Sequence, residues 1–204
     1  MDSNVNTKRG MALALAKSVM NEGVSLFASF IMLLNFQRFG KMKGCGKIVE
    51  WSVRDESMHV EGISHLFRAF CSENASIVDN DLKKEIYEMS SKVVELEDKF
   101  IDLAYKMGEP EGLPKEDVKN YIRYIADRRL LQLGLKTNFK VKENPIAWLE
   151  WILNAADHTN FFENRVTEYE VAGLTGDWQE AYGSPKDRVV CDDDTGTCEI
   201  KVPA

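Results

Sequence analysis

The sequence predicts an all-α protein built as a bundle of long helices. Apolar residues recur at helical spacing over long stretches, and short segments rich in glycine and proline separate these stretches. No stretch shows the alternation of apolar and polar residues that indicates a strand. With 204 residues, 44% of them hydrophobic, the chain has the size and composition of one domain with a packed core and a tail.

The helices are expected in five stretches. The first is long for a globular protein, which by itself favours a bundle, and a glycine follows it. The later boundaries follow glycines and prolines, and Asn144-Pro145 begins the last stretch because proline suits a first helical turn. The expected helices are Lys8–Phe39, Met42–Cys71, Asn80–Met107, Lys115–Leu133 and Pro145–Asn160. From Gly173 onward the pattern fails, so residues 173–204 are expected to form a flexible tail.

Charge and composition exclude several classes of protein. A net charge of −7 argues against direct binding of nucleic acid, which requires a positive surface. The polar N-terminus shows no secretory signal, and the longest apolar run, Val24 to Leu34, is too short to span a bilayer. Four cysteines are too few for a disulfide scaffold, so a reduced, cytoplasmic protein is expected. Cys191 and Cys198 could form a redox pair, but two unrelated thiols are the preferred interpretation.

Three residues, Glu22, Glu56 and His59, are candidate ligands of a metal ion. Glu56 and His59 are three residues apart and therefore share one face of a helix. Glu22 is an acid within an otherwise apolar helix, where a carboxylate is costly unless it is neutralised or coordinated. Carboxylate and imidazole ligands suit iron or manganese, and ferritin-like bundles hold dinuclear centres with two Glu-x-x-His pairs and two further carboxylates.

The chain supplies only part of such a site. It has one Glu-x-x-His pair, and such pairs also occur by chance on solvated faces. The other two histidines, His65 and His158, are expected to be structural or to lie on the surface. From the residues alone, Glu22, Glu56 and His59 would form an incomplete site.

Four segments in the right order resemble the small, radical-generating subunit of class I ribonucleotide reductase. The resemblance covers about residues 8 to 182. Its segments are Glu22-Gly23 with Ala28-Ser29-Phe30, then Arg54-Asp55-Glu56-Ser57-Met58-His59, then Tyr124 to Leu130, and finally His158 to Tyr169. It implies a ferritin-like half-domain over residues 1–172.

The resemblance also implies roles for individual residues. Glu22, Glu56 and His59 would be the ligands that the C-terminal half of the family contributes to a dinuclear iron or manganese centre. Asp55 would hydrogen-bond a metal-ligating histidine and help relay a radical; alternatively, it pairs with Arg54 or another basic group. Tyr182, 22 residues from the end, would pass the radical to the large subunit, although an ordinary tail tyrosine is an equal alternative.

The N-terminal half of the family is not matched. That half would bring the other Glu-x-x-His pair, the first acidic ligand and the radical tyrosine. A split subunit completed by a separate chain is preferred over a truncated fragment or a decayed homologue, because Met1 precedes the Glu22 helix closely and the ligand set is intact. The expected partners are that N-terminal half and the large (alpha) subunit, in a dimeric assembly without a membrane. Two rivals remain: a stand-alone ferritin-like metal protein or oxygenase, and a non-catalytic fragment that binds the large subunit.

Overall fold

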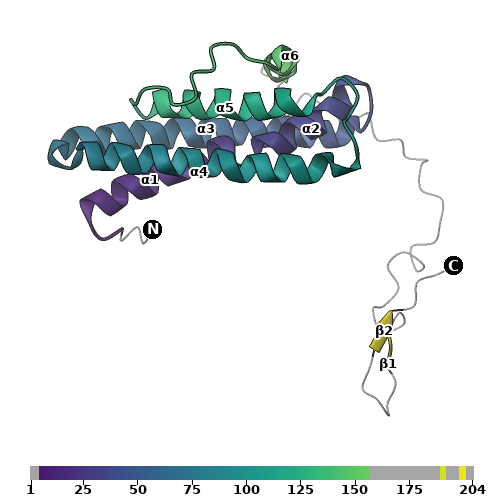
Figure 1. Ribbon diagram of the computed structural model, residues 1–204, viewed down its shortest axis with the longest axis horizontal. Helices are drawn as coiled ribbons and strands as arrows, with labels where there is room; N and C mark the ends of the chain where they lie inside the picture. Colours follow the sequence, from purple (N-terminus) through teal and green to yellow (C-terminus); the bar gives the residue numbers. More distant parts are fainter. Residues whose placement is uncertain (1–4, 157–188, 192–197, 201–204) are drawn as a thin grey trace. The chain divides into compact units, whose positions relative to one another are not determined.

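The computed structural model of the chain describes residues 5–156, 189–191 and 198–200. The chain divides into two compact units, Met1–Val166 and Thr167–Ala204. The first unit is helical in all its described elements, which confirms the predicted all-α bundle (Figure 1). The expected tail, residues 173–204, is described only at two short strands.

Five main helices form the bundle, and α1 lies against α3, α4 and α5. On the other sides of α1, α4 packs against α5 and α3 packs against α2. The main helices are α1 (Lys8–Val24), α2 (Phe27–Arg38), α3 (Lys43–Glu73), α4 (Asn80–Ala104) and α5 (Lys115–Gln132). Shorter helices are η1 (Ala75–Ile77), η2 (Tyr105–Met107) and α6 (Ala147–Ala156).

Two expectations about these elements were wrong. The continuous first helix is interrupted at Ser25 and Leu26, although both keep right-handed helical dihedrals. The tail also contains a hairpin that the sequence did not predict, with β1 (Val189–Cys191) antiparallel to β2 (Cys198–Ile200). Most other helix ends lie within a few residues of the expected positions, as is usual for boundaries drawn from sequence.

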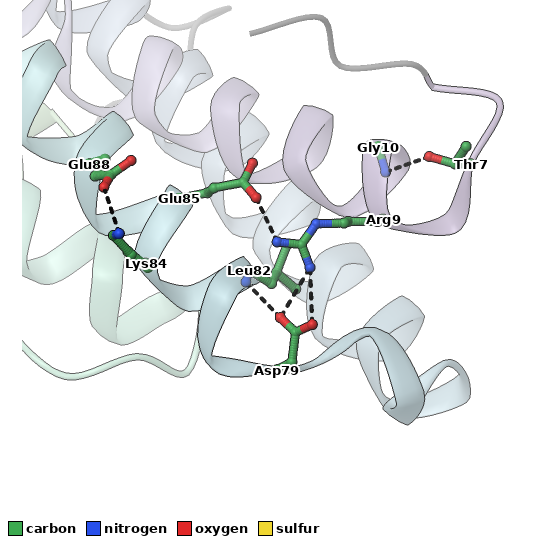
Figure 2. Close-up of polar contacts among 8 residues, drawn as sticks. All are labelled: Thr7, Arg9, Gly10, Asp79, Leu82, Lys84, Glu85 and Glu88. Atoms are coloured by element: carbon green, nitrogen blue, oxygen red, sulfur yellow. Dashed lines mark hydrogen bonds and ion pairs between the residues drawn. The ribbon is translucent and has the colours of Figure 1, made fainter.

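Side-chain caps and ion pairs fix where α1 and α4 begin (Figure 2). The Thr7 hydroxyl accepts a hydrogen bond from the Gly10 N–H at 3.0 Å, and Asp79 accepts one from the Leu82 N–H at 2.7 Å. The Arg9 guanidinium donates to Asp79 at 3.0 Å and to Glu85 at 2.5 Å. The starts of α1 and α4 therefore lie together, and the two helices run in parallel.

The segment from α1 to α2 is the centre of the bundle. Its fully buried side chains include Ala12, Ala16, Met20, Ala28 and Ile31. By length and composition alone Lys8–Arg38 could cross a membrane, with a mean hydropathy of 1.4 in its most apolar window. Half of that window is buried inside the bundle, as expected for the core helix of a helical protein.

The loop after α5 is held by one buried carboxylate. Asp127 is 2% exposed and accepts hydrogen bonds from the backbone N–H groups of Asn138, Phe139 and Val141, at 2.7, 2.9 and 3.2 Å. Gly134, with φ of +80°, ends α5 in a left-handed turn that few other residues adopt without strain. This part of the segment that resembles the reductase family therefore has a structural role.

Candidate metal centre

The structure brings together the three residues predicted as metal ligands. Glu22 comes from α1, while Glu56 and His59 come from adjacent turns of α3. Each offers a ligand atom, and these atoms lie within 4.8 Å of one another. The His59 Nδ1 atom is 3.5 Å from Glu56 Oε2 and 3.9 Å from Glu22 Oε2. Residues that are 34 and 37 positions apart in the sequence thus form one cluster because α1 packs against α3.

The environment of Glu22 fits a bound cation. Its Oε1 atom accepts a hydrogen bond from the Ser18 hydroxyl at 2.9 Å, whereas its Oε2 atom is buried and has no hydrogen-bond partner. A buried carboxylate oxygen without a donor is costly, and a metal ion would satisfy it. Two carboxylates and one imidazole are a donor set that suits iron or manganese. The residues present therefore fit half of a dinuclear centre.

The cluster is open on one side. The His59 side chain is 60% exposed, and those of Glu22 and Glu56 are 31% and 24% exposed. Exposed apolar side chains share the helix faces that carry the ligands: Met11 and Leu26 on the Glu22 face, and Ile48 and Leu66 on the His59 face. We call these four residues the flanking apolar residues. Exposed apolar groups around a polar centre are typical of a surface that another segment covers.

The glycine after Glu22 makes room for a buried arginine. Arg129 of α5 donates from Nε to the Gly23 carbonyl at 3.1 Å, and its guanidinium lies 5.5 Å from the centre of the Phe27 ring. A Cβ atom at Gly23 would come within 2.5 Å of Arg129 Nε. Burial lowers the pKa of Arg129 to about 10, and it nevertheless remains a cation at neutral pH. The Glu22-Gly23 pair is therefore explained by packing at Gly23 as well as by chemistry at Glu22.

A buried acid lies on the other side of the helix interruption. Glu97 of α4 is 7% exposed, and the Ala28 backbone N–H donates a hydrogen bond to its carboxylate. Burial raises the pKa of Glu97 from 4.5 to about 7, with Asp98 adding to the rise and the Ala28 N–H opposing it. Arg129 thus meets a carbonyl at the end of α1, and Glu97 meets an N–H at the start of α2. The Arg129 cation has the sign that the helix dipole favours at the end of α1.

The other predicted site residues are not brought to the cluster. Asp55 is exposed, and within the described residues it makes no hydrogen bond or ion pair with His59 or Arg54. His65 is exposed and lies 3.1 Å from an Arg68 guanidinium nitrogen, as expected for a surface histidine. Tyr182 and His158 lie outside the described residues. The role of Asp55 in a relay therefore stays a prediction.

Fold and cluster together define a ferritin-like helical bundle that carries a group of residues able to hold a metal ion. A family model described as "Ribonucleotide reductase, small chain" matches residues 1–145. The chain belongs to the ribonucleotide reductase small chain family. Members of this family generally depend on a dinuclear metal centre and act with a large subunit, and this chain carries a group of residues suited to such a centre.

Individual relatives agree with this assignment. The chain is 51% identical over 162 residues to a probable ribonucleoside-diphosphate reductase small subunit of Invertebrate iridescent virus 3. That match covers 79% of this chain and 43% of the viral protein. A ribonucleoside-diphosphate reductase subunit beta of Chlamydia pneumoniae is 35% identical over 155 residues, covering 76% of this chain and 44% of its own length.

A solved structure gives the same result for the fold. A putative class I ribonucleotide reductase from Bacillus halodurans aligns with a TM-score of 0.68 and 25% sequence identity. The alignment covers 71% of this chain and 52% of that protein. The chain therefore spans about half the length of the proteins it matches.

Sequence reasoning missed the two charged residues at the helix interruption. Arg129 lies within a segment already matched to the family, but nothing in its neighbours indicates that it is buried against Gly23. The burial of Glu97 could have been predicted, because Glu97 follows the buried positions Ile86, Ser90 and Val94 at helical spacing. An acid on the apolar face of α4 is the same kind of evidence that identified Glu22 on α1.

Proposed function

We propose that the chain is the C-terminal part of a split ribonucleoside-diphosphate reductase small subunit. It supplies Glu22, Glu56 and His59 to a dinuclear iron or manganese centre, and a second polypeptide with the N-terminal helices of the fold supplies the remaining ligands. In this proposal the completed subunit works in the cytoplasm, in a dimeric assembly, with the large subunit. It generates the radical that starts reduction of ribonucleotides to deoxyribonucleotides.

The open face of the cluster is the observation that carries this proposal. Three ligands leave a dinuclear centre incomplete, and the exposure of His59 leaves space for donors from another segment. The flanking apolar residues support a covering segment with an apolar surface, since Leu26 is 44% and Leu66 is 55% exposed.

Each ligand has a definite task in this proposal. When bound, the metal pair supplies oxygen activation and a stored oxidising equivalent, chemistry that protein side chains do not provide. Glu22 and Glu56 neutralise the charge of the ions, and His59 adds a nitrogen donor. Ser18 orients Glu22 by occupying Oε1, which leaves Oε2 free for a cation. Gly23 and Arg129 fix the end of the helix that carries Glu22.

In this proposal, radical transfer runs through Asp55 and Tyr182. We assign Asp55 to the relay because its position matches the family motif and because it makes no polar contact within the described residues that would give it a structural role. An exposed carboxylate one residue before Glu56 is free to bond a histidine from the covering segment. Tyr182 remains the candidate for the step to the large subunit.

Metal analysis of the paired protein tests the proposal. The chain is co-expressed with a polypeptide bearing the N-terminal helices of the family, and the purified complex is analysed for iron and manganese. Two ions per complex are expected, and His59→Ala should lower this content strongly. His65→Ala is the matched control, because His65 is also an exposed histidine of α3 but lies outside the cluster. A complex without a dinuclear centre would contradict the proposal.

Measurements on the single chain separate the rival interpretations. A stand-alone ferritin-like protein would bind about two ions per pair of identical chains without any partner. A non-catalytic fragment would bind the large subunit equally well after metal removal, and its thermal stability would not change. The split subunit predicts neither result.

A further inference from the structure

The hairpin of the second unit places two cysteines opposite each other. β1 and β2 are antiparallel, and the register pairs Val189 with Ile200, Val190 with Glu199 and Cys191 with Cys198. Cys191 is the last residue of β1 and Cys198 is the first of β2, so they form the pair nearest the connecting segment. The sequence alone favours two unrelated thiols over a redox pair, and the register is the observation that joins them.

The backbone geometry of such a pair matches that of a disulfide. Directly opposite residues of antiparallel strands have Cα atoms about 4.5 to 5.5 Å apart. Disulfide-bonded cysteines have Cα separations of about 4.4 to 6.8 Å. A register shifted by one residue would no longer place the two cysteines opposite each other, so the proposed bond depends on the observed register.

We propose that Cys191 and Cys198 are a redox-active pair that forms a reversible disulfide across the hairpin. The oxidant is a disulfide, either glutathione disulfide or the oxidised form of a dithiol protein. One cysteine thiolate attacks a sulfur of that disulfide, which breaks its S–S bond and releases one thiol. The second thiolate then attacks the mixed disulfide. The Cys191–Cys198 bond forms, and the oxidant leaves as two thiols that carry the two electrons and two protons.

The two cysteines of the bundle, Cys45 and Cys71, are too far apart to form a disulfide with each other. Cys45 and Cys71 lie on the same helix, α3, 26 residues apart, which corresponds to about 39 Å at 1.5 Å per residue. Both are half-buried, and burial raises the pKa of the Cys71 thiol, so less of it is the reactive thiolate. Among the four cysteines of the chain, the hairpin pair is the one that the register preorganises for oxidation.

Oxidation changes the stability of the hairpin itself. Each strand has three residues, and an isolated hairpin of this size is marginally stable in water. A disulfide removes open conformations, because it links the strand ends across the six residues 192–197. The oxidised tail is therefore expected to hold the hairpin firmly, whereas the reduced tail holds it weakly.

Thiol mapping of the full chain over a series of glutathione redox ratios tests the pair. After acid quenching, unfolding and alkylation, mass spectrometry should show that Cys191 and Cys198 lose their alkyl labels together, at one ratio. The hairpin peptide should lose two hydrogen atoms and no chain should be added. Cys45 and Cys71 should remain labelled.

Variants make the result decisive. In Cys191→Ser the remaining Cys198 should form only a mixed disulfide with glutathione, and Cys198→Ser should behave in the same way at Cys191. Cys71→Ser is the matched control and should leave the midpoint of the transition unchanged. Independent titration of the two tail cysteines, a disulfide to Cys45 or Cys71, or bonds between chains would each overturn the proposal.

Discussion

Replacement of Gly23 by alanine tests the packing that fixes the helix of Glu22. The added Cβ atom would lie 2.5 Å from Nε, 2.9 Å from Cδ and 3.0 Å from Cγ of Arg129. Ordinary contacts begin near 3.4 Å, so the arginine side chain would have to move. It has little freedom to do so, because it is 9% exposed and donates to Gly23 and to Gln132.

Two opposing effects set the magnitude. Overpacking of a buried site costs about 1 to 3 kcal/mol. Alanine is favoured over glycine within a helix by about 1 kcal/mol. Gly23→Ala should therefore lower the free energy of unfolding by about 0 to 2 kcal/mol. If Arg129 is first replaced by alanine, the obstacle is gone, and Gly23→Ala should then raise the free energy of unfolding by up to about 1 kcal/mol.

A double-mutant cycle followed by urea unfolding measures this coupling directly. The interaction between positions 23 and 129 should be about 1 to 3 kcal/mol. Gly62→Ala is the matched control, because Gly62 is a helical glycine of α3 whose added Cβ would meet nothing within 4 Å. It should have the same small stabilising effect in both backgrounds. If the effect of Gly23→Ala were also the same in both backgrounds, the reasoning would be refuted.

Two further predictions concern buried carboxylates. The pKa of Glu97 is raised above its unfolded value, so its contribution to stability is greatest below pH 4.5 and is lost as the pH rises towards 7, by about 3 kcal/mol in all. In urea unfolding between pH 4 and 8, the Glu97→Gln variant should gain stability relative to the parent chain as the pH rises. The variant Glu88→Gln, at an exposed position, is the control and should follow the parent. If the stability of Glu97→Gln and that of the parent changed with pH in the same way, the assignment would be contradicted. Asp127→Ala should cost about 3 kcal/mol or more, because three backbone N–H groups lose a charged acceptor. A loss under about 1 kcal/mol in urea unfolding would show that the loop does not depend on Asp127.

Much of the bundle and its candidate site could be predicted because local rules govern them. Helical spacing of apolar residues located the five helical stretches, and the caps Thr7 and Asp79 act through neighbours in sequence. Glu56 and His59 share a face by spacing alone. Glu22 could be singled out because a carboxylate in an apolar helix is costly, and the structure places it in one cluster with Glu56 and His59.

The remaining features depend on contacts between residues distant in sequence. The helix is interrupted at Ser25 and Leu26, next to the places where Arg129 of α5 and Glu97 of α4 contact it. Arg129 is 106 positions from Gly23 in the sequence. Neither residue is adjacent to the break in sequence, so a window of local sequence predicts an unbroken helix. The pairing of Cys191 with Cys198 likewise depends on a strand register, which two short strands specify only weakly in sequence.

Anomalous X-ray diffraction from crystals of the paired protein, at the iron and manganese edges, tests the central claim most directly. The account predicts two metal positions side by side, with Glu22, Glu56 and His59 of this chain among their ligands and the other donors from the second polypeptide. Metal bound elsewhere in the complex, or a complete centre to which these three residues contribute nothing, would contradict it.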